Sequence, residues 1–341
     1  MATLGNTYVD LIDIYKQTDP DGAGARIIEI LKQQNPILDD AVAMECNKGG
    51  EHVHTIRTGL PSVSWGALYK GIPQSKSHTQ QVTDTTGFVE GLSTIDTRVL
   101  DLANGKEAQV RMNEAMGFLE AMNQEVATGL FYHDTATTPE KFKGLSARYN
   151  VRGGSGAGNQ VIHGGGSSTD NTSIWFVTWG DRFTHLLYPQ GTQAGIKRED
   201  KGEQRVTDGD GNAYYVKEEL FKWHVGAAVK DWRYNARVAN IDVSEMQAGN
   251  VDLYALMRQA YYKLQSRMRR GDAGGGRQAI YCNRDVLEAL DALATNGGSS
   301  DSFVRLTPRE IEGQEVLTYR GIPIRETDAL LNTEAVVPAA A

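Results

Sequence analysis

The chain has 341 residues, of which 40% are hydrophobic and 23% are charged, and its formal net charge is −8. This balance supports a sizeable buried core and excludes global disorder. The negative charge argues against a protein whose main task is to grip nucleic acid, and the length suits two domains or one large domain with insertions.

The two cysteines, Cys46 and Cys282, lie far apart and have neither metal-type nor redox-type spacing. We therefore expect reduced thiols in a cytoplasmic protein. The N-terminal sequence lacks the pattern of a secretory signal, and no apolar run is long enough to span a bilayer.

The first elements expected are two short helices, Tyr8–Gln17 and Ala25–Gln34, in a segment where acidic residues outnumber basic ones. An unusual arm, Arg57–Val82, follows between expected strands at His52–Thr58 and Gly87–Ser93. The arm contains no Asp or Glu, three basic residues, two prolines and a lone tryptophan. It has neither helical nor strand periodicity, yet it is too apolar for an ordinary linker.

The strongest helix pattern covers Lys106–Phe131. Its apolar stripe consists of Ala108, Met112, Met116, Leu119, Met122, Val126 and Leu130. We interpret the methionines as packing residues, because methionine fills irregular gaps between elements. The glycine-rich runs that follow, Gly153–Gly158 and Gly164–Gly166, are interpreted as flexible linker.

A β-rich stretch comes next. Asn171–Gly180 (NTSIWFVTWG) predicts a strand buried on both faces. The turn residues Asp208–Gly211 lie between β-forming residues and predict a hairpin. Asp231–Val243 predicts a further strand.

The last ninety or so residues predict a small unit of alternating helices and strands. The expected elements are the helix Val251–Arg270, the strand Gln278–Cys282, the helix Asp285–Ala294 and a strand Glu315–Thr327 interrupted by Gly321 and Pro323. We expect the tail Val336–Ala341 to be frayed.

Catalytic and metal-binding templates do not fit this sequence. The GGSGA run at Gly153 has Ala157 where a nucleophile elbow needs glycine, and the Asp208 turn has Ala213 where a calcium loop needs glycine. His52 and His54 would share one face of a strand, with Cys46 and Glu51 nearby, so they could form part of a metal site. Because no third and fourth ligands are evident, a solvent-facing pair of histidines is favoured. The basic run Arg267–Gly271 either complements a helix dipole or touches nucleic acid. We predict no catalytic residue, no cofactor and no metal.

The acid-free arm suggests contact with another chain. Arg57, Lys70 and Lys76 would pair with an acidic neighbouring surface, and Trp65 and Tyr69 would anchor in a pocket. A head-to-tail contact of this kind builds rings or lattices. The alternative is a long loop folded back over its own domain.

The order of these parts resembles the major capsid proteins of tailed bacteriophages, whose fold is named for the Hong Kong 97 phage. The run AIYCNRDVLEALDAL, followed by VLTYRGIPIRET, is similar to the axial domain of that fold. Lys106–Phe131 resembles the spine helix of its peripheral domain, and Arg57–Val82 resembles its extended loop. The runs ILDD, TIRTGLPSV, EAMNQE and DNTSIW are similar to capsid proteins of short-tailed phages (podoviruses).

The resemblance implies an α+β fold with four regions. These are an N-terminal arm with helices (1–45), an extended loop region (46–100), a peripheral domain with the spine helix and a β-rich insertion (101–250), and an axial domain (251–341). It also implies a major capsid protein that is not an enzyme. Such a protein self-assembles through pentamers and hexamers, in the host cytoplasm, into the icosahedral shell that encloses the phage genome.

The partners that the resemblance implies are other copies of the chain, a portal, a separate scaffolding protein and a decoration protein. A separate scaffolding protein is expected because the sequence has no long helical N-terminal extension to be cleaved off. Contact with packaged DNA would be weak, and no membrane is involved.

Three other functions fit the composition. An encapsulin-like compartment would have the same fold, and a hydrolase would use His and Asp residues that meet only in three dimensions. A β-rich adhesion or carbohydrate-binding module is suggested by Trp175, Trp179, Trp223 and Trp232, although we interpret these as core residues.

Overall fold

The computed structural model describes residues 32–103, 105–265, 276–295, 306–311 and 314–340. The first expected helix lies outside the described residues, as does the second except for its last positions, 32–34, which are irregular. The basic run Arg267–Gly271 also lies outside them.

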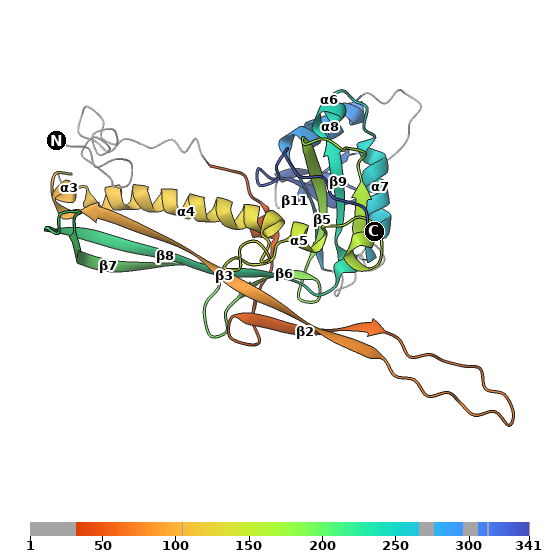
Figure 1. Cartoon of the computed structure of the whole chain (residues 1–341). Helices are drawn as coiled ribbons and strands as arrows, with labels where there is room; N and C mark the ends of the chain where they lie inside the picture. Colours follow the sequence, from red (N-terminus) through yellow and green to blue (C-terminus); the bar gives the residue numbers. More distant parts are fainter. Residues whose placement is uncertain (1–31, 104, 266–275, 296–305, 312–313, 341) are drawn as a thin grey trace.

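The chain forms an elongated part and a compact part (Figure 1). The helices are α2 (Ile37–Asp40), α3 (Thr97–Asp101), α4 (Glu107–Tyr132), α5 (Leu145–Arg148), α6 (Val243–Gln247), α7 (Leu253–Lys263) and α8 (Arg284–Thr295), with 3-10 turns η1 (Gly156–Gln160) and η2 (Trp232–Tyr234). The strands are β1 (Ala43–Glu45), β2 (Glu51–Gly59), β3 (His78–Asp96), β4 (Val161–His163), β5 (Asn171–Trp179), β6 (Thr184–Tyr188), β7 (Ile196–Thr207), β8 (Ala213–Val229), β9 (Ala236–Asp242), β10 (Arg277–Cys282), β11 (Leu306–Ile311), β12 (Gln314–Tyr319) and β13 (Ile322–Glu326).

One branched sheet runs through both parts. Its main path is β11-β12-β13-β10-β5-β6-β8-β3-β2, while β1 pairs with β6, β4 and β5 pair with β9, and β7 pairs with β8. Helices α6, α7 and α8 lie around the compact part, and α4 lies along the elongated part (Figure 1). A single hydrophobic cluster joins Ile174 of β5 and Val238 of β9 to Leu253, Ile280 and Leu290 of the C-terminal elements.

Strand β3 is much longer than the seven residues expected at Gly87–Ser93. Its first part pairs with β2, from Arg57↔Thr79 to Glu51↔Thr85. Its second part pairs with β8, from Thr86↔Gly226 to Asp96↔Val216. The outer pairing contains mostly polar residues, so it produces no hydrophobic alternation that sequence analysis could detect.

The long helix predicted at Lys106–Phe131 is confirmed as α4, but its apolar stripe is only half buried. Met122, Val126 and Leu130 are in the core, whereas Met112 is 62% exposed and Met116 and Leu119 are also exposed. The interpretation of Met112 and Met116 as packing residues is therefore wrong. The physical reason is the length of the helix, which extends beyond the compact part. In its first half, Val110 and Ala115 are buried in place of Met112 and Met116.

The glycine-rich runs are held by backbone hydrogen bonds, such as those from Gly164 and Gly166 to Ala239 and Asn240, so their interpretation as a linker is wrong. A Cβ on Gly158 would lie 2.3 Å from the carbonyl oxygen of Gly153, and one on Gly164 would lie 2.7 Å from that of Asn240. Only glycine permits such close backbone approaches. These glycines therefore allow the segment to pack beside β4 and β9.

Most C-terminal predictions are confirmed, with three corrections. Helix α7 ends at Lys263, where Leu264 is extended, and the predicted positions 266–270 lie outside the described residues. The interrupted strand is a hairpin of β12 and β13, turned by Arg320 and Gly321, which both have positive φ angles, as a tight two-residue turn requires. The tail is ordered through residue 340, because Arg152 bonds Pro338 and Ala340 through the backbone.

Strand β5 and the β7–β8 hairpin agree with the sequence analysis. Every residue of β5 is buried, including Trp175 and Trp179, which confirms these two tryptophans as core residues. The Asp208 side chain accepts backbone hydrogen bonds from Asp210 and Asn212 and closes the hairpin turn.

The unequal burial of α4 predicts unequal effects of truncation along its stripe. Leu130→Ala should lower the free energy of unfolding by about 2–5 kcal/mol, because it opens a cavity in the core. Met112→Ala should change it by less than about 0.5 kcal/mol. Urea unfolding of the purified subunit measures both values, and equal losses would contradict the burial described for this helix.

Candidate intersubunit interface

The extended loop is the most exposed apolar segment of the described chain. Residues 60–77 connect β2 to β3 and project away from the body (Figure 1). Trp65 is 100% exposed and Val63 is 93% exposed. The other exposed apolar side chains of the tip are Leu60, Leu68, Tyr69 and Ile72. Such a concentration of exposed apolar side chains marks an interaction surface.

Few contacts fix the tip itself. The Ser75 hydroxyl donates to the carbonyl of Ser62 at 2.8 Å, and the Lys70 amide donates to that of Ala67 at 3.2 Å. Tyr69 has a φ of 63°, in the region that non-glycine residues rarely adopt. Within the described residues, the loop does not fold back over its own domain.

The five residues selected from the sequence all lie on this projecting segment. Arg57 is at the outer end of β2, and Trp65, Tyr69, Lys70 and Lys76 are on the tip. All five are exposed. In the described part of the chain, none of the three cations among them forms a salt bridge, so their charges remain free to meet another molecule.

The loop is joined to the body by polar contacts at its base. Asn47 exchanges two hydrogen bonds with the backbone of Val53, at 2.8 and 2.7 Å. Asp84 of β3 forms a 2.8 Å ion pair with Arg148 of α5. Arg148 also donates to the carbonyl of Ala227, at 2.9 Å.

Two of the histidines considered in the sequence lie at this base, and their environment differs from the one expected. His52 is only 8% exposed, so the interpretation as a solvent-facing pair is wrong. Its ring lies edge-on to that of His185 of β6, with centroids 5.5 Å apart. Sequence reasoning missed His185 because it lies more than a hundred positions away in the chain. Among the residues that the structure describes, no group of three or more His, Cys, Asp or Glu side chains is arranged to hold a metal ion.

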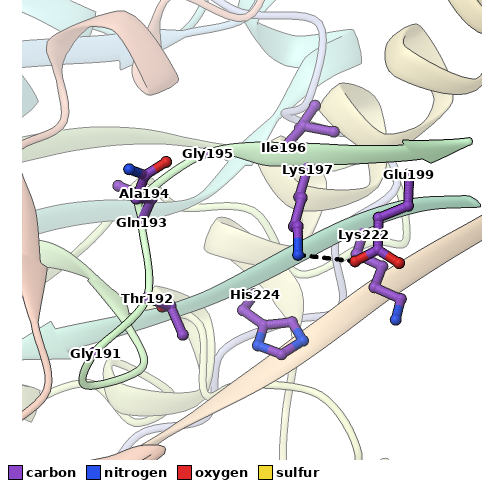
Figure 2. A pocket seen from close by; sticks show the side chains of 10 residues that line it. All are labelled: Gly191, Thr192, Gln193, Ala194, Gly195, Ile196, Lys197, Glu199, Lys222 and His224. Carbon is purple, nitrogen blue, oxygen red and sulfur yellow. Dashed lines mark ion pairs between the residues drawn. The ribbon is translucent and has the colours of Figure 1, made fainter.

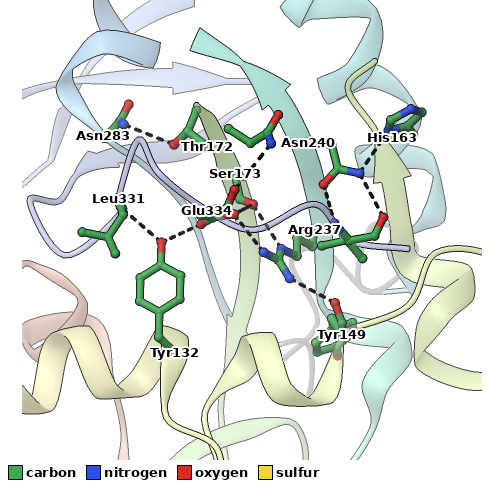
Figure 3. Close-up of polar contacts among 12 residues, drawn as sticks. Tyr132, Tyr149, His163, Thr172, Ser173, Arg237, Asn240, Asn283, Leu331 and Glu334 are labelled. Carbon is green, nitrogen blue, oxygen red and sulfur yellow. Dashed lines mark hydrogen bonds and ion pairs between the residues drawn. The ribbon is translucent and has the colours of Figure 1, made fainter. Parts of the chain in front are cut away.

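A second polar network joins the spine helix, the compact part and the C-terminal segment (Figure 3). Glu334 forms a 2.8 Å ion pair with Arg237, and the two side chains are 3% and 4% exposed. Tyr132, at the end of α4, donates to Glu334 at 2.5 Å, and Ser173 of β5 also donates to it. Arg237 lies over the ring of Trp175, 4.9 Å from its centroid.

The charge on Glu334 is therefore stabilised from several sides. Burial, followed by the neighbouring Glu334 carboxylate, raises the pKa of Tyr132 well above its ordinary value, so its hydroxyl remains a hydrogen-bond donor. Asn240 fixes the following residues, with its side chain bonding the amide and carbonyl of Val337 at 2.8 and 3.0 Å. We call these contacts the C-terminal clamp.

An open pocket of about 520 Å³ lies between the loop at Gly191–Gly195 and strands β7 and β8 (Figure 2). Lys197 and Glu199 in its wall form a 2.9 Å ion pair. The ring of His224 packs against that of Phe88, with centroids 5.2 Å apart. These groups are therefore engaged with each other or with the pocket wall.

Comparisons with known proteins agree with this architecture. The family model described as major capsid protein GP7 matches residues 19–338. The chain belongs to this family. A solved structure of bacteriophage Epsilon15 is 33% identical, covers 99% of both chains and superposes with a TM-score of 0.76.

More distant structures include the holo-SrpI encapsulin complex from Synechococcus elongatus, at 12% identity, 69% coverage of this chain, 96% of that chain and a TM-score of 0.40. Another is Mycobacterium phage Adephagia, at 10% identity, 65% and 92% coverage and a TM-score of 0.41. No curated protein matches.

The family assignment confirms the main predictions. The protein is a major capsid protein with the α+β Hong Kong-97-type fold, and it assembles with itself into the icosahedral shell of a virion. No helix among the described residues is long and apolar enough to cross a bilayer.

The C-terminal clamp predicts strong coupling between its two charged members. Arg237→Met should lower the free energy of unfolding by about 3–5 kcal/mol, because it leaves the Glu334 carboxylate buried without a cation. The double variant Arg237→Met/Glu334→Gln should recover part of that loss. Urea unfolding measures the cycle, and simple additivity of the two single changes would contradict the coupling.

Proposed function

We propose that the extended loop is the segment with which each shell subunit grips its neighbour. The observation that carries this proposal is the tip, whose apolar side chains are almost fully exposed on a segment that projects from the body. We assign Trp65 and Tyr69 as anchors in the neighbour, and Arg57, Lys70 and Lys76 as partners of its acidic side chains.

The direction of this contact suits a closed shell. A loop that reaches from one copy onto a different surface of the next makes a head-to-tail contact, and such contacts close into rings when the rotation between neighbours divides a full turn. Pentamers and hexamers would arise from the same contact with small changes of angle. We infer that these rings are closed by contacts of the projecting loop, in addition to any contacts between the compact parts.

We further propose that the chain is divided into four regions. Residues 1–45 would form the N-terminal arm, and residues 46–100 would form the extended loop region. Residues 101–250 would form the peripheral domain and 251–341 the axial domain. Within 101–250, strands β5 and β9 would belong to the axial unit instead, because they share a hydrophobic cluster with α7, β10 and α8.

We propose that the chain acts as a building block and not as an enzyme, and that assembly takes place in the host cytoplasm. Further partners would be a separate scaffolding protein, a portal and a decoration protein. The net charge of −8 supports only weak contact with packaged DNA, since like charges repel.

Charge reversal on the loop tests the proposal. Arg57→Glu and Lys70→Glu should each lower the yield of shells severalfold, because each replaces an attraction to the neighbour with a repulsion. Trp65→Ala should do the same by removing an anchor. Light scattering and negative-stain microscopy measure the yield, with the scaffolding protein supplied.

The matched controls are Arg57→Lys and Lys70→Arg, which keep the charge and should assemble normally. Because the tip is exposed, all these variants should keep the circular dichroism and urea midpoint of the parent subunit. Normal shells formed at normal rates by both charge-reversed variants would overturn the proposed role of the loop. An enzyme cargo in purified shells, in place of nucleic acid and portal, would point to an encapsulin-like compartment.

A further inference from the structure

A cluster of buried polar side chains lies where the extended loop joins the body. Strand β2 contributes His52 and His54, β3 contributes Asp84, and β6 contributes His185. Asp84 and His185 are 4% and 0% exposed. The ring centroids of His52 and His54 are 6.2 Å apart, so three imidazoles from two elements meet at the loop base.

Several polar atoms of this cluster have no hydrogen-bond partner. These atoms are Nδ1 of His52, Nδ1 of His54, both ring nitrogens of His185, Oδ2 of Asp84 and Nε of Arg148. The backbone of Gly180 lies near His185 and slightly favours its charged form, but the contact falls outside ordinary hydrogen-bond geometry. A concentration of unpaired buried atoms is rare in folded proteins and requires an explanation.

The charged groups around the rings come from four other places in the chain. Arg148 of α5 pairs with Oδ1 of Asp84 at 2.8 Å, which ties the loop strand to the body. The second oxygen of Asp84 lies 4.0 Å from Nδ1 of His54, beyond hydrogen-bond distance. Lys230, after β8, and Asp181, before β6, form a 3.2 Å ion pair beside the cluster.

The environment favours neutral rings. Burial and then Lys230 lower the pKa of His52, and burial also lowers the pKa of His54, although Asp84 opposes the shift. For His185, burial, followed by the charges of Lys230 and His52, lowers the pKa from 6.5 to about 4. A lowered histidine pKa means that the packed state gains stability above pH 6.5 and loses it as the pH falls toward 4.

We propose that His52, His54 and His185 form a proton-operated hinge for the extended loop. With neutral rings, the loop base packs against β6 and the ion pair between Asp84 and Arg148 holds β3 on the body. When His54 takes up a proton, it attracts the free oxygen of Asp84 and competes with Arg148. When His52 and His185 take up protons, they repel each other and Lys230, and the base opens.

Hydrogen exchange of the full-length chain at pH 7 and pH 5 tests this hinge. After correction for intrinsic exchange rates, protection of the β2 amides and of the adjoining part of β3 should fall about 20-fold. This factor follows from moving the pKa of His185 alone from 6.5 to about 4. Strand β5, in the core, serves as the internal reference and should change little.

Two substitutions, one in the hinge and one elsewhere on the sheet, make the test specific. His185→Asn should reduce the pH-dependent loss to a few-fold, whereas His224→Asn, in the middle of β8, should leave it unchanged. If His185→Asn does not fold, His185→Gln gives the same comparison. An equal loss in the parent and these hinge variants, or no loss in the parent, would overturn the hinge.

The hinge stands independently of the proposed grip on a neighbour. Tip variants such as Lys70→Glu should retain the full pH response of the loop base while they assemble poorly. Failure of one proposal is therefore distinguishable from failure of the other.

Discussion

The continuity of β3 is the constraint on which the rest of the structure depends. Among the described residues, its outer part pairs with β2 alone, and its inner part pairs with β8 in the middle of the sheet. Because paired strands keep a fixed register, a displacement of the loop must bend the ribbon at its base or shift the sheet. The sheet resists such a shift, since Phe118 of α4 stacks on Phe221 of β8, with centroids 5.5 Å apart, and approaches Gly91 of β3 too closely for a Cβ there. We therefore expect any displacement of the loop to occur at its base.

Buried carboxylates in the compact part hold distant stretches of chain against this sheet. In the C-terminal clamp, Glu334 meets Arg237 and Tyr132. Near the start of the described chain, Asp40 meets Arg277 at 2.7 Å and accepts a hydrogen bond from Tyr281 at 2.9 Å. Buried charges stabilise a fold only when their partners satisfy them, and both carboxylates have several. The two ends of the described chain are thus fixed to the strands that they cross.

Local patterns in the sequence were sufficient for much of the fold. The apolar period of α4, the continuous apolar run of β5 and the turn residues at Asp208 each act within a short window, and each prediction is confirmed. The exposure of Met112 was not predictable, because periodicity gives the apolar face of a helix but not how far the core extends along it. The histidine cluster was not predictable either, because His185 reaches His52 only through the pairing of four strands.

The exposed tip also bears on how a shell assembles correctly. Each apolar side chain that docks in a neighbour contributes about 1.5–3 kcal/mol if fully buried, but the tip must be ordered at a cost in entropy. Under the proposed grip, the net gain from one loop would therefore be modest, and a misplaced subunit could leave again. Each subunit of a closed ring would both give and receive a loop, so the last subunit to enter would make two such contacts at once. Weak single contacts that act together in the closed ring favour complete rings over irregular aggregates.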